Sequence, residues 1–366
     1  MNRMIVANLA HRPVRSFISI FAIAIEVTLI LVIVGLSLGM LNDNKERQKG
    51  VGADAMVRPP GSSNIIGMSG APVSIKVADV LRKLPHVKAV APVVLQANTN
   101  GVEIIFGIDL NSYNSLGNAF RYIEGGPFQR PDDIIVDDYF AKSKHVHVGE
   151  RTEVLNHSFR ICGIVEHGKG GRKFLPIGTL QGLIGARDKA SIFYVKLDDP
   201  NNYAAFKNEA LQVPGMQNYV VTSMSEWLSL MTPEALPGFS VFIYTVIGVS
   251  VGIGFIVIFQ AMYTAVMERT REIGILKSLG ASKFYIVNVI LRETGLLAVV
   301  GILVGILISY TTQQGLLQAF PTLRVAFDPH WVVRASIIAL VGAILGALYP
   351  AYKASQKDPI DALAYE

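Results

Sequence analysis

Four long apolar stretches dominate the pattern of hydrophobic and polar positions along the chain. An α-helix that crosses a bilayer needs about 20 consecutive apolar residues, and each stretch is long enough to supply them. The pattern therefore predicts transmembrane helices at 17–41, 239–267, 284–312 and 331–352. The last three lie close together in the sequence, whereas the first stands alone.

The segment between the first two predicted helices, residues 42–238, has a different pattern. Short β-branched runs end at Gly, Asn or Asp, which is typical of strands in a folded α+β domain. The segment is long enough to bury a core of its own. Residues 50–70 are rich in Gly, Pro, Ser and Asn and are predicted to form a loop that could face a partner. Strands are predicted at 87–95, 102–108, 133–136, 152–155, 159–165 and 191–196, and helices at 77–84, 138–142 and 203–211.

Basic residues near the helix ends predict the orientation. Lys and Arg gather in residues 1–16, 268–283 and 353–366, whereas residues 313–330 hold only Arg324. Because Lys and Arg are enriched on the cytoplasmic side of membrane proteins, those three segments are expected in the cytoplasm. The large domain and the short last loop are then extracytoplasmic.

The first apolar stretch could also be a cleaved signal peptide. Its apolar run is about twice as long as that of a usual signal sequence. No A-x-A-like site closes it, since the exit reads Gly39-Met40-Leu41-Asn42-Asp43. We therefore expect a retained helix.

Composition agrees with a membrane protein. Hydrophobic residues make up 51% of the 366 positions, charged residues only 17%, and the mean hydropathy is +0.41, whereas soluble chains carry about 25% charged residues. The net charge of +5 does not indicate nucleic-acid binding, because residues 42–238 hold 21 basic and 20 acidic residues and the excess lies in the membrane part. The single cysteine, Cys162, excludes an internal disulfide, and no P-loop or metal-binding motif is present.

Glycines four residues apart occur in all four predicted helices. This spacing puts both glycines on one helix face and lets another backbone approach closely, although glycine is common in membrane helices in any case. We interpret the pairs as helix-packing positions within the chain or between protomers. They are Gly35 and Gly39, Gly248 and Gly252, Gly301 and Gly305, and Gly342 and Gly346.

Few polar residues suggest chemistry. Glu26 lies inside the first predicted helix, where an ionisable group is costly and often functional. It could pair with a neighbouring helix, relay a proton, or be a neutral carboxyl held by a hydrogen bond. Adjacent carboxylates could bind a cation or act as acid and base, but without a supporting pattern they are interpreted as solvated turn residues. These pairs are Asp132–Asp133, Asp137–Asp138 and Asp198–Asp199.

The most informative stretch follows the second predicted helix. Ile273, Leu276 and Leu279 recur at helical spacing and predict a short amphipathic helix at the membrane surface. Gly280 suits the end of that helix, and Ser282 can cap the next one. The pattern alone fits either a docking element or a generic juxtamembrane linker.

This stretch resembles the cytoplasmic signature of MacB/FtsX-type permeases of ABC transporters. The sequence Glu-Arg-Thr-Arg-Glu-Ile-Gly at 268–274 is followed by Lys277, Leu279, Gly280 and Ala281. Glu293, which counts with Glu26 as an intramembrane polar position, fits the same family. Further similarity lies in the basic lead-in 12–16, the tail segments 350–355 and 358–363, and the domain segments 123–128, 148–150 and 159–165, which resemble the MacB-type periplasmic core.

The resemblance implies an α-helical membrane protein with four transmembrane helices plus a large extracytoplasmic α+β domain, in the bacterial inner membrane. Two permease copies, identical or paralogous, would pair among the membrane lipids above an ABC ATPase dimer. The chain itself would need no cofactor and have no enzymatic activity, because ATP and Mg would bind to a separate ATPase. The implied coupling residues are Glu268, Arg269, Arg271, Glu272, Gly274, Lys277, Gly280 and Ala281.

The resemblance leaves three functions open. The first is export of amphipathic substrates with a periplasmic adaptor and an outer-membrane channel, driven by mechanotransmission to the external domains. The second is extraction of lipoproteins. The third is FtsX-like regulation of a cell-wall hydrolase. This function is less favoured, because FtsX itself has a much smaller external domain than residues 42–238.

Overall fold

The computed structural model describes residues 13–62, 71–98, 103–236 and 238–357. Its internal contacts divide the chain into two compact units, which are described separately. Unit 1 consists of Met1–Gly39, Gly238–Gln318 and Val325–Glu366, and unit 2 consists of Met40–Pro237 and Ala319–Arg324.

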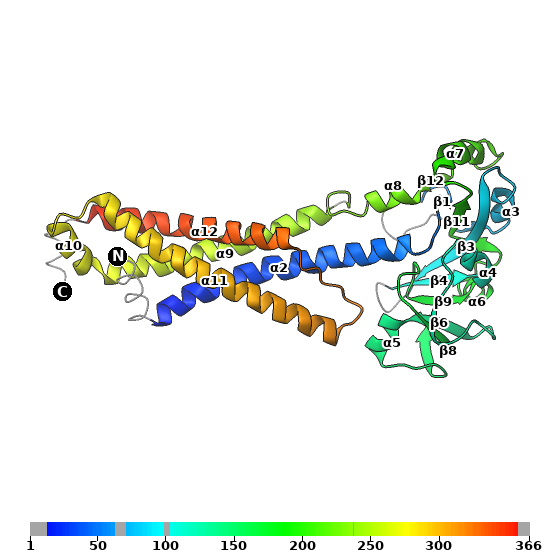
Figure 1. Cartoon of the computed structure of the whole chain (residues 1–366), viewed down its shortest axis with the longest axis horizontal. Helices are drawn as coiled ribbons and strands as arrows, with labels where there is room; N and C mark the ends of the chain where they lie inside the picture. Colours follow the sequence, from blue (N-terminus) through cyan, green and yellow to red (C-terminus); the bar gives the residue numbers. More distant parts are fainter. Residues whose placement is uncertain (1–12, 63–70, 99–102, 237, 358–366) are drawn as a thin grey trace. The chain divides into compact units, whose positions relative to one another are not determined.

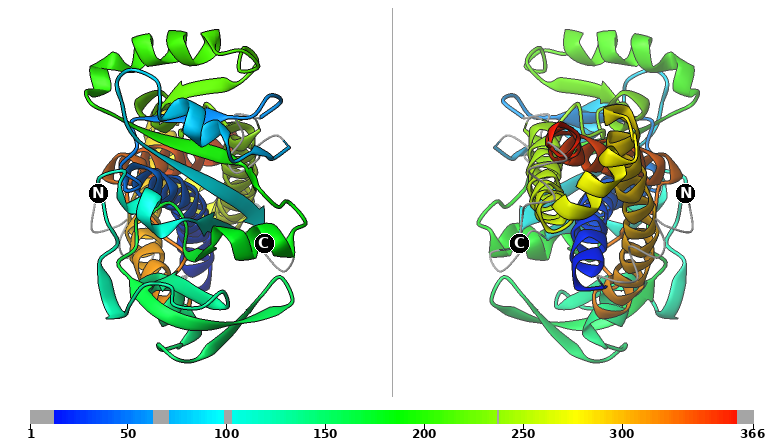
Figure 2. Two further views of the ribbon diagram at one scale, coloured as in Figure 1. Left: turned by 90° about the vertical axis from the view of Figure 1, so that its right-hand side faces the viewer. Right: turned by 90° about the vertical axis from the view of Figure 1, so that its left-hand side faces the viewer.

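Unit 1 is a bundle of long helices, labelled in Figure 1 and seen nearly end-on in Figure 2. By length and hydropathy, four helices among the described residues can cross a membrane, as the sequence predicted. Each extends beyond its predicted apolar span, α9 by one residue and the other three at both ends. The helices are α2 (Pro13–Lys49), α9 (Phe239–Glu268), α11 (Lys283–Ala319) and α12 (Pro329–Gln356), and the short α10 (Thr270–Ser278) lies between α9 and α11.

The seam between α9 and α12 is built from small side chains. Alanines occur at every fourth position of α12, and all are fully buried. At Gly346 an added Cβ would lie 3.0 Å from the carbonyl oxygen of Phe255. Small residues at this spacing let two helix backbones approach closely, so α12 packs tightly on α9. The alanines of this stripe are Ala335, Ala339, Ala343, Ala347 and Ala351.

The contact between α2 and α11 is equally close. A Cβ at Gly305 would lie 2.8 Å from the carbonyl oxygen of Ala24, and one at Gly301 would lie 3.0 Å from that of Ile20. The hydroxyl of Thr28 donates a hydrogen bond to the carbonyl oxygen of Gly305 at 3.1 Å. Side chains larger than hydrogen would therefore force these two helices apart.

Unit 2 contains a mixed sheet of ten strands within the described residues, in the order β12-β1-β11-β3-β4-β9-β6-β8-β5 with β7 paired to β8. Most neighbours are antiparallel, but β4–β9 and β6–β8 are parallel. The strands are β1 (Ala55–Arg58), β3 (Val87–Ala97), β4 (Ile104–Ile108), β5 (Tyr122–Gly125), β6 (Asp133–Asp137), β7 (Arg151–Val154), β8 (His157–Val165), β9 (Lys173–Pro176), β11 (Ile192–Leu197) and β12 (Val220–Ser223), and β2 (Val73–Ser74) pairs separately with β10 (Lys189–Ala190).

Both faces of the central strands are buried. Val93 and Phe106 belong to one apolar cluster, whereas the neighbouring residues Val94 and Ile105 belong to another. Successive side chains of a strand point to opposite faces, so apolar runs such as β3 and β4 support two cores. The helices that accompany the sheet are α3 (Val77–Leu81), α4 (Leu110–Asn114), α5 (Asp138–Lys144), α6 (Ile177–Leu183), α7 (Tyr203–Gln212) and α8 (Met224–Ser229), with a 3-10 turn η1 at Pro200–Asn202.

One prediction for unit 2 was wrong in part. Residues 50–70 were expected to be loop, but Ala55–Arg58 form β1, a buried strand between β11 and β12. The strand has only four residues, and the flanking Gly and Pro residues hid it. Residues 63–70 of that segment, and the start of the strand predicted at 102, lie outside the described residues.

Candidate coupling site

The segment between α9 and α11 is a short helix bounded by two sharp breaks. The C-cap residue Arg269 ends α9, and α10 begins at the next residue. At the other end Gly280 has φ +94°, and its amide and that of Ala281 donate to the carbonyl oxygens of Lys277 and Leu276, each at 3.0 Å. The hydroxyl of Ser282 then accepts a hydrogen bond from the amide of Tyr285 at 3.2 Å. The predicted helix end at Gly280 and the cap at Ser282 are confirmed.

The faces of α10 differ from the predicted ones. Ile273 is buried and Leu276 is half-buried, but Leu279 is 79% exposed. Residues three apart are rotated by about 60° with each step around an α-helix of 3.6 residues per turn. Leu279 therefore lies far from the face that Ile273 buries. The exposed charged and apolar side chains of this segment, here called the docking face, are those of Arg271, Glu272, Ile275 and Leu279.

A buried ion pair joins the end of α9 to α11. Nη1 of Arg269 lies 3.1 Å from Oε2 of Glu293, and their side chains are 12% and 3% exposed. Glu272 lies 4.0 Å from the same guanidinium. Arg269 thus contacts α11, and the sequence analysis, which singled out both residues, did not reveal that they pair.

Lys277 joins α10 to the end of α12. Its Nζ donates to the carbonyl oxygen of Ser355 at 3.0 Å and also to that of Lys357. The last carbonyl groups of a helix lack partners within the helix, and a cation there also complements the helix dipole. The arrangement holds α10 against both α11 and α12, while the docking face stays exposed.

Glu26 lies where α2, α9 and α12 meet. Its side chain is buried, and a Cβ at Gly254 would overlap its Oε2. Oε1 has no hydrogen-bond partner among the described residues and is 3.9 Å from where a Cβ of Gly342 would be. Gly254 was missed by the sequence analysis, although Ser250 and Gly254 form a small-residue pair four apart on the buried side of α9.

The other predicted glycines differ in their surroundings. A Cβ at Gly35 would lie 2.6 Å from the carbonyl oxygen of Ala326, and Gly39 is buried. At Gly248 and Gly252 no atom of the described chain lies within 4 Å of an added Cβ. These two glycines therefore pack against no other helix among the described residues of unit 1.

The paired carboxylates of unit 2 include more than solvated turns, which corrects the sequence interpretation. Asp133 is fully buried, and its Oδ1 accepts hydrogen bonds from Nε and Nη2 of Arg160 at 2.9 and 2.7 Å. Asp137 is also buried, and burial raises its pKa to about 6 although Arg172 opposes the shift. No local sequence pattern marks these pairs, because Arg160 and Arg172 lie 27 and 35 residues away from their partners along the chain. Among the described residues no group of three or more His, Cys, Asp or Glu could hold a metal ion.

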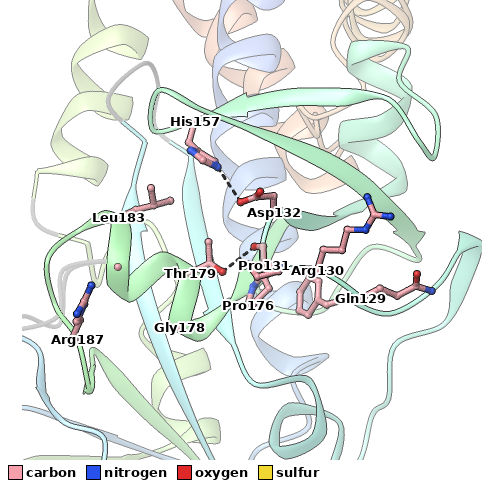
Figure 3. A pocket seen from close by; sticks show the side chains of 12 residues that line it. Gln129, Arg130, Pro131, Asp132, His157, Pro176, Gly178, Thr179, Leu183 and Arg187 are labelled. Atoms are coloured by element: carbon pink, nitrogen blue, oxygen red, sulfur yellow. Dashed lines mark hydrogen bonds and ion pairs between the residues drawn. The ribbon is translucent and has the colours of Figure 1, made fainter.

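A shallow concavity of about 830 Å³ lies on the surface of unit 2 (Figure 3). His157 Nε2 pairs with Asp132 at 3.1 Å on its wall. Arg130 and Arg187 lie at opposite ends of it and pair with no carboxylate among the described residues. The side chain of Leu183, which is 40% exposed, adds an apolar patch to this surface. A wide-open surface of this kind suits a protein loop better than an enclosed small molecule.

Comparison with known families agrees with this architecture. The MacB-like periplasmic core domain matches residues 16–213, and the FtsX-like permease C-terminal domain matches residues 244–359. These two domain matches, together with the four apolar helices, place the chain among ABC transporter permeases, as a membrane protein with a periplasmic domain. The chain belongs to the MacB/FtsX-type family of these permeases.

Curated relatives bear the description macrolide export ATP-binding/permease protein MacB. One from Shewanella is 25% identical over 97% of this chain and 59% of its own length. One from Escherichia coli K12 is 26% identical over 78% of this chain and 48% of its own length, and one from Rhodopirellula baltica is 30% identical over 49% and 27%. The chain thus spans between about a quarter and three fifths of these relatives.

Solved structures give a weaker match. The periplasmic region of MacB from Actinobacillus actinomycetemcomitans aligns with 48% of this chain and 92% of its own length at 16% identity and a TM-score of 0.38.

The two family domains that match the sequence of this chain, at residues 16–213 and 244–359, are both of the permease type.

Proposed function

We propose that this chain is the permease subunit of an ABC transporter and that α10 couples it to a separate ATPase. ATP and Mg would bind to that ATPase. ATP-driven closure of the ATPase would displace α10, and α2 and α9 would transmit the displacement to unit 2. In this proposal both termini and α10 lie in the cytoplasm, and the chain exports amphipathic substrates.

The observation that carries the proposal is the way in which α10 is held. The Arg269–Glu293 pair and the bonds from Lys277 connect it to α11 and α12, so a force on α10 reaches the bundle. The docking face presents two charges and two apolar side chains, a composition that suits a protein–protein contact. A generic linker would have no reason to be anchored at both ends.

The test is a double charge swap on the docking face. Arg271→Glu with Glu272→Arg conserves the net charge and changes neither partner of the Arg269–Glu293 pair nor the bonds from Lys277, although it removes the 4.0 Å contact of Glu272 with Arg269. We expect the ATPase recovered with the tagged chain to fall by about fivefold or more, since misplaced interface charges weaken association. The matched control swaps the exposed ion pair Arg121 and Glu166 in unit 2. Equal recovery from the test and control variants would refute the assignment of the docking face.

Further partners follow from the surfaces that remain open. The uncovered glycines Gly248 and Gly252, with exposed Val249 and Ile253 beside them, support pairing with a second permease copy within the lipid. The concavity with Arg130 and Arg187 supports contact with a periplasmic adaptor, which would lead to an outer-membrane channel. An adaptor gene beside this one would favour export, whereas a chaperone gene would favour lipoprotein release and a hydrolase gene FtsX-like regulation.

A further inference from the structure

One buried guanidinium joins three distant segments of unit 2. Arg172 directly precedes β9, and its side chain is only 10% exposed. Its Nη2 donates to Oδ2 of Asp43 in α2 and to the carbonyl oxygen of Thr322, both at 3.0 Å. Its Nη1 donates to Oδ2 of Asp137 at the end of β6, at 3.2 Å. Thr322 belongs to residues 319–324, the segment of unit 2 that connects α11 with α12 in the chain.

A second contact holds the same segment. The guanidinium carbon of Arg324 lies 4.4 Å from the ring centroid of Tyr139, the second residue of α5. His167 stacks on this ring with centroids 4.0 Å apart, and its Nε2 lies 2.9 Å from the Tyr139 hydroxyl. The ring is therefore held in place as a platform for the cation, an arrangement favoured by the electrostatics of aromatic faces.

These contacts differ from an ordinary surface ion pair. Asp43 and Asp137 are 10% and 1% exposed, and Asp43 is also 3.1 Å from Nε of Arg47. A planar guanidinium offers several donors in a rigid fork, and charge-assisted hydrogen bonds shielded from water are strong and directional. Because Thr322 accepts through its main-chain oxygen, the hydrogen bond fixes the backbone of the segment and does not depend on a side chain of that segment.

The two helices that residues 319–324 connect are the ones that hold α10. Glu293 lies early in α11 and pairs with Arg269, and Ser355 lies late in α12 and accepts from Lys277. We propose that residues 319–324 form a third mechanical link, beside α2 and α9, which carries displacement of α10 into unit 2 through Arg172 and Tyr139. This link rests on the proposed function, whereas the clamp that fastens the segment stands on the contacts alone.

Hydrogen exchange of the full chain with its copurified ATPase tests the link. Arg324→Ala removes only the contact with Tyr139, and Arg172→Lys keeps the charge but loses the fork. In the nucleotide-free complex each variant should raise exchange of residues 319–324 by about tenfold. With ADP and vanadate bound, the wild type should change its exchange at residues 133–144, and both variants should lose this change. Arg121→Ala, at an exposed arginine of unit 2, should behave as the wild type.

Each failure has a separate meaning. Unchanged exchange of residues 319–324 in both variants would overturn the clamp. A loosened segment with an intact nucleotide response at residues 133–144 would overturn the link but leave the proposed function standing. A wild-type chain that binds no ATPase would refute the proposed function and the link together, and the nucleotide-free comparison would still decide the clamp.

Discussion

At the scale of single residues, Glu26 packs directly against Gly254, where an added Cβ would overlap Oε2 of the carboxyl. The sequence marked Glu26 as unusual, because a carboxyl within an apolar helix is costly. It could not reveal the partner, because Gly254 has no side chain that would pair with an acid. The buried carboxyl occupies the space that any larger residue on α9 would need.

Gly254→Ala should therefore destabilise the bundle. The new methyl group overlaps Oε2 of Glu26, and overpacking a close-packed core costs about 1–3 kcal/mol. The midpoint of thermal unfolding in detergent should fall. In the double variant Gly254→Ala with Glu26→Ala, the smaller side chain at position 26 leaves room for the methyl group, so part of the loss should be restored. Gly315→Ala, in α11, is the matched control, since no atom of the described chain lies within 4 Å of an added Cβ there. The same midpoint for both single variants would contradict the packing at Glu26.

At the scale of elements, α10 was partly predictable. Local chemistry gave its end at Gly280 and the cap at Ser282, because these depend on backbone conformation within a few residues. The role of Arg269 was not predictable, since an arginine beside a membrane helix has the same pattern whether it is solvated or paired. The strand β1 was missed for a similar reason. It has only four residues, and it is stabilised as a strand by pairing with β11 and β12, which lie far away in the sequence.

Breaking the pair between Arg269 and Glu293 should loosen α10 from α11. Arg269→Ala leaves Glu293 as a buried charge without this partner, and such losses cost about 3–5 kcal/mol. We expect a lower unfolding midpoint together with a reduced response of the ATPase rate to the permease. Exchanging the two charges, Arg269→Glu with Glu293→Arg, should recover part of both. If the single variant unfolds as the wild type does, the pair is not a structural connection.

At the scale of the whole molecule, hydropathy predicted the four membrane helices well because length and apolarity decide that feature alone. Of the ten strands in the sheet of unit 2, β1, β5, β9 and β12 were missed, and six were foreseen from β-branched runs, as at Phe159–Val165 within β8. Its sheet order was not, since the parallel pairings of β4 with β9 and β6 with β8 join segments far apart in the chain. The buried pairs Asp133–Arg160 and Asp137–Arg172 depend on that topology and stayed hidden with it.

The proposed function requires that α10 receives an ATPase on the cytoplasmic side of the membrane. A photo-crosslinking amino acid at Leu279, which is 79% exposed on the docking face, tests it most directly in native membranes. The control places the same group at Leu183, which is exposed in the concavity of unit 2. We predict a crosslink to an ABC ATPase from position 279 and none from position 183. An ATPase crosslinked from position 183, or from neither position, would refute the docking of an ATPase on α10.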